Sequence, residues 1–568
     1  MHIGVDVGGT YTDGVIIDHD RVIQTVKIPT KKNLAHSIEL VIAQLAANNG
    51  AENIDKIVIS TTLITNLLAE KKHESVGLLL LPGPGVNPAD LNFVCPTVVI
   101  RGAVDYRGRI IVEADLREVQ QAVEGMLAKG INSIAVACKF SQRNPVLENK
   151  VIEYLGQSYP RVITIASHRV SGLLNWLRRA NGAALTLMIS EKYHFFIRQI
   201  EESLAKMKIC CPIYVLKADG GTLPLELALQ YPLESVFSGP AASALGALAF
   251  ADKNITSVVM DIGGTTTDLA IILNGVPLLS ERGAFIDNYP IPVRGLALTS
   301  LALGGDTSIT AQNGRVSLGP RKGQAYCLGG PRLTITDILV YLGKSDISSS
   351  EEVVGALGEL AGSLGRKPQE IAAEVIDIFM DTLEAKLEEM FHKWEEEPAY
   401  HIWQVLSQQK KRPAAIICLG GPADGLGALW GERKGWDVQI PPYSPVANAI
   451  GAALAKTTLR LELHADTEQM RYSTNLGSVG GPLATKLKNT DEAKQFALSI
   501  FRELSDKWSL EKDYTGNIPE TIYEESFNLI RDWHTSGKIF QIGLQTPSGI
   551  QTVLHPCSKK APEGGAKQ

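Results

Sequence analysis

The stretch DVGGTYTD at residues 6–13 recurs as DIGGTTTD at residues 261–268. Each copy follows a short apolar run, at 3–7 and at 258–262, which predicts a buried strand that ends at the motif. A second strand pattern follows each copy, so each motif is expected at the tip of a β-hairpin. The two copies lie much farther apart than the units of a solenoid. They therefore predict two homologous halves that face each other across one ligand.

The residues of each motif are suited to binding phosphate. Glycines let the backbone approach a ligand closely because they have no Cβ, and their N–H groups can form an anion-binding concavity. These glycines are Gly8, Gly9, Gly263 and Gly264. Neighbouring hydroxyls add donors, from Thr10, Thr12, Thr265, Thr266 and Thr267. The leading carboxylates, Asp6 and Asp261, would repel phosphate, so we expect them to hold Mg²⁺ through its waters. Ordinary hairpin turns are the alternative, but the repeated frame favours a nucleotide site.

Composition narrows the class of protein. The chain has 568 residues, of which 45% are hydrophobic and 20% charged, as in globular proteins of two to four domains. A net charge of −6 argues against a nucleic-acid partner. No apolar run is long enough to cross a membrane, and the N-terminus lacks a signal peptide, which predicts a cytoplasmic protein. The seven cysteines include no C-x-x-C pair, so we expect reduced thiols.

Strand and helix patterns alternate along residues 1–160, which predicts an α/β fold. We expect a first half over residues 1–250 with a return helix at 444–460, a second half over 251–443, an α+β appendage over 461–557 and a disordered tail over 558–568. Further expected elements are helices at 66–72, 172–206 and 371–390, and a last strand at 551–554.

Two segments rich in small residues, 239–249 and 444–455, predict helices that pack closely where two halves hinge. Plain buried helices are the alternative. Gly420 and Gly421 follow a strand pattern and offer a flat backbone surface for an adenine ring, unless they form an ordinary strand-to-helix turn. A further Gly-Gly loop contains Gly304, Gly305 and Asp306.

In this order the motifs resemble those of the actin/hexokinase/heat-shock-chaperone ATPase superfamily. The resemblance implies two actin-like, ribonuclease H-like domains around a nucleotide cleft, with the small C-terminal α+β region added. Further strings resemble the hydantoinase A/5-oxoprolinase family: STTLITN at 60–66, FSGPAASALGA at 237–247 and LGGPRLTITD at 328–337. This second resemblance covers roughly residues 1–460.

The family resemblance implies an enzyme that uses ATP and Mg²⁺ to phosphorylate the oxygen of a cyclic amide or enol, with a hydantoinase B-like partner subunit in an oligomer. The expected catalytic carboxylates are Asp6, Asp13, Asp261, Asp268 and Asp306. For Asp13, Asp268 and Asp306, which would orient the acceptor or a water, capping of a turn is the alternative. The expected substrate contacts are Thr61, Thr62, Thr65 and Asn66, which follow a strand and precede a helix. Helix N-capping is the other role open to them.

Two other functions stay open at this point. The chain has Ile59-Ser60 where family members often carry a histidine, and 297–300 lacks the histidine found there in many members. These departures do not affect the residues expected to bind ATP, but they leave the identity of the molecule that accepts the phosphate undetermined. The alternatives are the ATP-using subunit of a ketone carboxylase and a chaperone-like ATPase that reactivates another enzyme.

Overall fold

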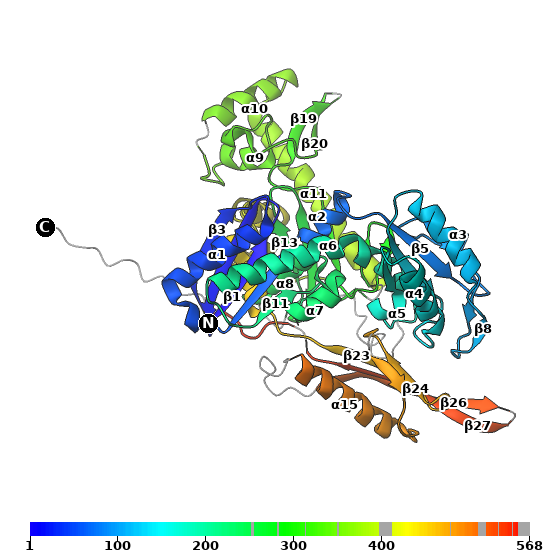
Figure 1. The fold of residues 1–568 in the computed structure, drawn as a ribbon. Helices are drawn as coiled ribbons and strands as arrows, with labels where there is room; N and C mark the ends of the chain where they lie inside the picture. The colour runs from blue at the N-terminus through cyan, green and yellow to red at the C-terminus, as the bar shows by residue number, and fades with distance from the viewer. Residues whose placement is uncertain are drawn as a thin grey trace.

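The computed structural model describes residues 1–251, 255–280, 283–312, 314–348, 351–396, 412–477, 479–508, 519–531, 533–547 and 549–554. These residues form a mixed α/β fold with a separate C-terminal sheet at one side (Figure 1). Among the described helices, none combines the length and the apolar character that a membrane span requires. The six cysteines in this part of the chain are unpaired.

The first motif lies in a six-stranded sheet of order β12-β11-β4-β1-β2-β3. Its strands are β1 (His2–Val7), β2 (Tyr11–Asp18), β3 (Arg21–Pro29), β4 (Lys56–Thr61), β11 (Ile213–Leu216) and β12 (Thr222–Pro224). β1, β2 and β3 are antiparallel neighbours, whereas β4 and β11 run parallel to β1. Helix α1 (Leu34–Asn49) packs on this sheet through buried residues such as Ile38 and Val41.

The second motif lies in a sheet with the same strand arrangement, of order β15-β14-β13-β21-β22. Its strands are β13 (Ser257–Ile262), β14 (Thr267–Leu273), β15 (Val276–Pro277), β21 (Ala415–Leu419) and β22 (Asp437–Gln439), and β18 (Leu298–Leu301) also pairs with β14. Again three antiparallel strands are followed by two that run parallel to the first. Both motifs therefore sit at hairpin tips, as predicted.

The two small-residue segments form helices that pack on each other. They are α8 (Ser238–Leu248) and α14 (Ala447–Leu454), the latter preceded by the 3₁₀ turn Ser444–Val446. A Cβ added at Gly451 would lie 2.0 Å from the carbonyl oxygen of Ala242, and one at Gly246 would lie 2.1 Å from that of Ala447. The two backbones are thus in direct contact, which explains the run of small residues.

A further parallel sheet, of order β10-β9-β5-β6, has a core of its own. Its elements are β5 (Val76–Leu81), β6 (Thr97–Val99), β9 (Ser133–Cys138), β10 (Ile163–Ala166), α3 (Leu116–Leu127) and α4 (Val146–Ser158). The long helix α6 (Trp176–Lys206) packs nearby and starts later than predicted, because Asn175 caps its first turn by accepting the N–H of Arg178 at 3.1 Å.

The helices after the second motif form an extension at the top of Figure 1. They are α9 (Ile335–Tyr341), α10 (Glu351–Ser363) and α11 (Pro368–Glu395), beside the hairpin of β19 (Ser308–Gln312) and β20 (Arg315–Gly319). The amphipathic helix predicted at 371–390 is confirmed within α11, whose apolar residues are buried. Shorter elements are α2 (Leu63–Ala69), α5 (Ser167–Val170), α7 (Leu225–Gln230), α13 (Ala423–Lys434), and the paired strands Ala103–Val104 with Ile110–Val112 and Phe285–Ile286 with Tyr289–Pro290.

The C-terminal sheet has the order β25-β24-β23-β27-β26 and is covered by α15 (Thr490–Lys507). Its strands are β23 (Arg460–Asp466), β24 (Arg471–Thr474), β25 (Gly480–Pro482), β26 (Glu520–Arg531) and β27 (His534–Gln545). The strand predicted at 551–554 is wrong. This segment leaves the sheet and returns to the helix pair, where Gln551 N–H donates to Leu454 and Leu554 N–H to Ala249. The predicted tail, 558–568, lies outside the described residues.

Candidate active site

The two motifs form the same turn. The N–H of Gly8 donates to the carbonyl of Tyr11 at 3.0 Å, and the N–H of Gly263 donates to that of Thr266 at 2.9 Å. The residues at the two tips are exposed: Gly9, Thr10, Gly264 and Thr265. Each tip therefore presents backbone and a hydroxyl to solvent, as binding of an anion requires.

Two of the threonines support the turns from behind and do not lie at the tips. Thr12 is fully buried, and its hydroxyl contacts that of Thr30 at 3.0 Å. Thr267 occupies the equivalent position in the second motif and donates to the carbonyl of Leu303 at 2.6 Å. The hydroxyls near the exposed backbone are therefore those of Thr10, Thr265 and Thr266.

The leading carboxylates of the two motifs meet at one amide. Asn448, on α14, donates from Nδ2 to Asp6 Oδ2 at 3.3 Å and to Asp261 Oδ2 at 3.3 Å. Asp261 Oδ2 also accepts the hydroxyl of Ser243, on α8, at 2.6 Å. The two motifs, far apart in sequence, thus form one site whose floor is the helix pair.

The trailing carboxylates stand across the hairpins from the leading ones. Asp13 pairs with Asp6 in the β1–β2 register, and Asp268 pairs with Asp261 in the β13–β14 register. Asp13 contacts Lys27 Nζ at 2.7 Å, whereas burial raises the pKa of Asp268 to about 6. Like charges and burial both favour the neutral acid, so this cluster would be relieved by a bound cation.

Asp6 fits a role in holding Mg²⁺. Its pKa is raised to about 7, chiefly by burial and in part by the neighbouring charges of Asp13 and Asp261. Within the described residues its Oδ1 is buried without a hydrogen-bond partner. No group of three or more His, Cys, Asp or Glu side chains in that part of the chain is arranged to hold a metal alone. Two carboxylates with retained waters and phosphate oxygens match the ligands that Mg²⁺ takes.

We expect Asp6→Asn to stabilise the metal-free protein at pH 8. The pKa of Asp6 is about 4 in the unfolded chain and about 7 in the folded protein, so between these pH values the folded protein binds one more proton than the unfolded chain. At pH 8 the carboxyl group is ionised in both states, and its burial as a charge lowers the stability of the folded protein. Stability therefore falls as pH rises through this window, and the variant escapes that loss. Thermal unfolding without Mg²⁺ checks this, with a smaller difference expected at pH 5. A less stable variant at pH 8 would contradict the assignment.

The segment with Gly304 and Gly305 packs against the second motif. Gly305 N–H donates to Gly263 at 2.9 Å, and a Cβ at Gly304 would lie 2.6 Å from the same carbonyl oxygen. Asp306 forms an ion pair with Arg321 at 3.1 Å, and Arg321 also donates to Thr265 Oγ1 at 2.9 Å. Asp306 thus positions a cation beside the motif tip. Its catalytic role stays a prediction.

Gly420 and Gly421 lie at the end of β21, next to the second motif. Gly420 has φ +94°, and an added Cβ would lie 2.2 Å from the carbonyl oxygen of Ile262. A Cβ at Gly421 would meet nothing within 4 Å. The turn therefore combines close contact with the motif strand on one side and open space on the other, as a flat surface for a ring requires.

The four residues predicted to contact substrate lie at the end of β4 and in the first turns of α2. Thr61 ends β4, and Thr62 Oγ1 donates to the carbonyl of Val7 at 3.0 Å. Thr65 and Asn66 lie inside α2, because the helix starts at Leu63 and not at 66 as predicted. Only Thr61 and Thr62 therefore precede the helix as predicted. The role of all four residues in binding substrate stays a prediction.

Sequence reasoning missed four residues of the site: Lys27, Ser243, Arg321 and Asn448. Asn448 carried a usable signal, since it is a lone amide in an otherwise small and apolar helix. Arg321 lies far from the motif in sequence and had no such signal.

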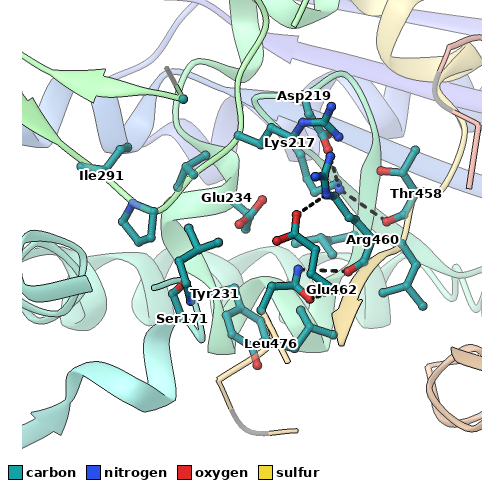
Figure 2. Close-up of a pocket in the computed structure, with 18 of the residues that line it drawn as sticks. Ser171, Lys217, Asp219, Tyr231, Glu234, Ile291, Thr458, Arg460, Glu462 and Leu476 are labelled. Atoms are coloured by element: carbon teal, nitrogen blue, oxygen red, sulfur yellow. Dashed lines mark hydrogen bonds and ion pairs between the residues drawn. The ribbon is translucent and has the colours of Figure 1, made fainter. Parts of the chain in front are cut away.

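A cavity of about 310 Å³ lies at the same edge of the first sheet as its motif (Figure 2). In it Lys217 Nζ contacts Asp219 Oδ2 at 3.1 Å, and Arg460 Nε contacts Glu462 Oε1 at 2.5 Å. The strand register places Lys217 level with the end of β4, two strands from Val7. At ordinary strand spacing this is about 10 Å from the first motif.

Three described carboxyl groups line this cavity, and Glu234 is the one that forms no ion pair within the described part of the chain. Figure 2 shows its side chain directed into the space between Lys217 and Glu462. Within the described residues it forms neither a side-chain hydrogen bond nor an ion pair, and burial raises its pKa to about 7. A carboxyl that changes charge near neutral pH, in a cavity, is suited to binding or exchanging a proton.

Comparison with known proteins now identifies the family. The pattern described as hydantoinase/oxoprolinase matches residues 179–461, and that of the hydantoinase/oxoprolinase N-terminal region matches residues 2–158. The caprolactamase alpha subunit of Pseudomonas jessenii is 24% identical over 60% of this chain and 54% of its own length. The acetophenone carboxylase gamma subunit of Aromatoleum aromaticum is 25% identical over 60% of this chain and 53% of its own. The chain thus matches about half the length of each.

A solved structure shares the fold across nearly the whole chain. The nucleotide-free structure of acetone carboxylase superposes with a TM-score of 0.71 at 18% identity, covering 96% of this chain and 87% of that one. At this identity the likeness establishes the fold alone. The two matching patterns cover both motifs, the helix pair and the Gly420 turn, and on them the chain belongs to the hydantoinase/oxoprolinase family.

Proposed function

We propose that this protein is an ATP-dependent hydrolase of the hydantoinase/oxoprolinase type, which activates a cyclic amide by phosphorylating its oxygen. We further propose that its two similar sheets are the halves of an actin-like ATPase. The observation that carries the proposal is the amide of Asn448, which binds the leading carboxylates of both motifs. One nucleotide between the motifs would be contacted from both halves, and the helix pair would form the floor of the cleft.

The residues of the site suit phosphoryl transfer, which depends on positioning and charge neutralisation more than on covalent help from the protein. The exposed tips would bind the phosphates, and Arg321 would add positive charge at the second tip. Asp6 and Asp261 would hold Mg²⁺, which neutralises phosphate charge when bound. Gly421 would leave room for the base. An unactivated amide is a poor electrophile, and transfer of phosphate to its oxygen supplies a leaving group for attack by water.

The cavity of Figure 2 is the acceptor site in this proposal. Ionised Glu234 would accept the amide N–H of the acceptor. As the amide oxygen bonds to phosphorus and the nucleotide leaves, the amide proton would pass to Glu234 and its electron pair would form the C=N bond. Lys217 and the Arg460–Glu462 pair would shape the rest of the cavity.

Glu234→Gln is expected to lower kcat/KM for the acceptor by about 100-fold, since general acid–base groups typically contribute that much or more. Glu226→Gln, at an exposed position of α7, is the matched control and should behave as the parent. Steady-state rates of acceptor-dependent ATP cleavage make the comparison. Equal kinetics for the two variants would exclude Glu234 from the acceptor site.

A screen for acceptors tests the reaction class. Purified protein, alone and with a hydantoinase B-like subunit, is incubated with Mg²⁺, ATP and hydantoin, 5-oxoproline or caprolactam. ATP cleavage that depends on a cyclic amide is the expected result. ATP cleavage that requires a ketone and bicarbonate would instead support the ketone carboxylase alternative, since an acetophenone carboxylase subunit and acetone carboxylase are among the similar proteins. Stimulation by a protein alone would support a reactivating ATPase.

A further inference from the structure

A second cavity, of about 620 Å³, lies where the parallel sheet of β9 and β10 meets the C-terminal sheet. The backbones touch at this seam. Gly172 N–H donates to the carbonyl of Asn475 at 2.8 Å, and a Cβ at Gly477 would lie 1.9 Å from the carbonyl oxygen of His168. The cavity thus lies between two segments that are about 300 residues apart in sequence and in contact in the fold.

Three arginines line the cavity. Arg143, Arg169 and Arg471 contribute to its wall, and none of its lining residues is Asp or Glu. Across the described ranges, these three guanidinium groups form no ion pair or side-chain hydrogen bond. Arg143 is half-buried, and burial lowers its pKa to about 10, so it remains charged at neutral pH. The charge of Asp466 acts on Arg143 from outside the cavity lining. In a chain of net charge −6, three arginines around one cavity that have no direct partner among the described residues favour the binding of an anion.

Two polar side chains of the cavity lining also have atoms available to bind a ligand. Gln142 is 8% exposed and lines the cavity, and in the described part of the chain neither atom of its amide has a hydrogen-bond partner. His168 is fixed by its Nδ1, which contacts Glu148 Oε2 at 2.5 Å, so Nε2 is the ring nitrogen left for a ligand. An orphaned buried amide is costly and calls for a partner that both donates and accepts.

We infer that this cavity binds a small organic anion, anchored through a phosphate or carboxylate group by Arg143, Arg169 and Arg471. The amide of Gln142 forms hydrogen bonds with a donor and an acceptor elsewhere on the same ligand. The volume lies within the range of small-molecule sites and exceeds that of inorganic phosphate alone. Because the ligand would contact both sides of the seam, its binding would stabilise the docking of the C-terminal sheet.

The site adjoins the acceptor cavity of Figure 2. Val170 and Tyr231 line both cavities, so one layer of side chains separates them. The inference does not rest on the proposed function, because it follows from the charge and the orphaned amide alone.

Isothermal titration calorimetry on the full chain tests the site, with inorganic phosphate, AMP and glutarate as separate probes at constant ionic strength. We expect saturable binding of AMP or glutarate and weakening by about tenfold or more in Arg143→Met, since charge-assisted hydrogen bonds are the strong ones. Arg161→Met is the matched control, an exposed arginine outside the cavity lining, and should bind as the parent. If Arg143→Met weakens the binding of AMP alone, the ligand carries a phosphate. If it weakens the binding of glutarate alone, the ligand carries a carboxylate.

Arg471→Ala provides a second variant, because Arg471 is exposed and its truncation leaves the core unchanged. It should also weaken binding and abolish the thermal stabilisation by the probe. The inference is overturned if none of the three probes binds saturably, or if Arg161→Met weakens binding as much as the two cavity variants. AMP that binds only at the motif tips would be unaffected by Arg143→Met and Arg471→Ala, and this result overturns the inference unless both variants weaken the binding of glutarate.

Discussion

Asp261→Asn is expected to reduce ATP turnover by about 100-fold or more while the protein stays folded. In the proposed site this carboxylate holds Mg²⁺ against the phosphates, and loss of one such electrostatic group typically costs about that factor. Folding is expected to survive because the amide oxygen of asparagine can still accept the hydroxyl of Ser243, now 2.6 Å from Asp261 Oδ2. Initial rates of ATP cleavage at saturating Mg²⁺ give the comparison.

Asp346→Asn is the control for this experiment, since Asp346 is exposed and remote from both motifs in sequence. It should retain the parent rate. Circular dichroism of both variants separates loss of chemistry from loss of structure. A parental ATPase rate in folded Asp261→Asn would refute the assignment of this carboxylate.

Gly451→Ala is expected to destabilise the protein by about 3 kcal/mol, at the upper end of what overpacking costs. The added Cβ would lie 2.0 Å from the carbonyl oxygen of Ala242 and 2.6 Å from the backbone nitrogen of Gly246. Backbone atoms cannot rotate away as a side chain would, so α8 and α14 must separate. Because Asn448 and Ser243 stand on these helices, the motif carboxylates would lose their common anchor.

Gly355→Ala is the matched control, the same substitution on helix α10 at an exposed position where an added Cβ meets nothing within 4 Å. It should stabilise the protein by up to about 1 kcal/mol, because alanine favours the helix. Urea unfolding midpoints of the two variants should therefore move in opposite directions. A midpoint for Gly451→Ala equal to that of the parent would contradict the close packing of the helix pair.

The local parts of the site could be predicted from sequence because their chemistry is local. The Gly-Gly motifs follow apolar strands, and the turn closed by Gly8 and the one closed by Gly263 are set within four residues. The helix pair could be predicted from its small residues, since only they allow backbone contact. The repeated motif also implied the repeated strand order that places both tips at one site.

Contacts between distant segments could not be predicted in the same way. Arg321 reaches Thr265 from a loop after β20, and the ion pair of Asp306 depends on it. Residues 551–554 have the apolar content of a strand, but the sheet they were expected to join already ends at β26 on one side and β25 on the other. Glu234 has no ion-pair partner among the described residues, because Lys217 is paired with Asp219 and Arg460 with Glu462. Arg460 reaches this cavity from a segment distant in sequence, so the sequence does not reveal the arrangement.

The central claim is that two motifs bind one nucleotide, and titration calorimetry with a non-hydrolysable ATP analogue tests it most directly. The expected result is one analogue bound per chain, only with Mg²⁺, and weakened both by Asp6→Asn in the first motif and by Asp261→Asn in the second. Two independent sites per chain, or binding that survives either substitution unchanged, would contradict the claim.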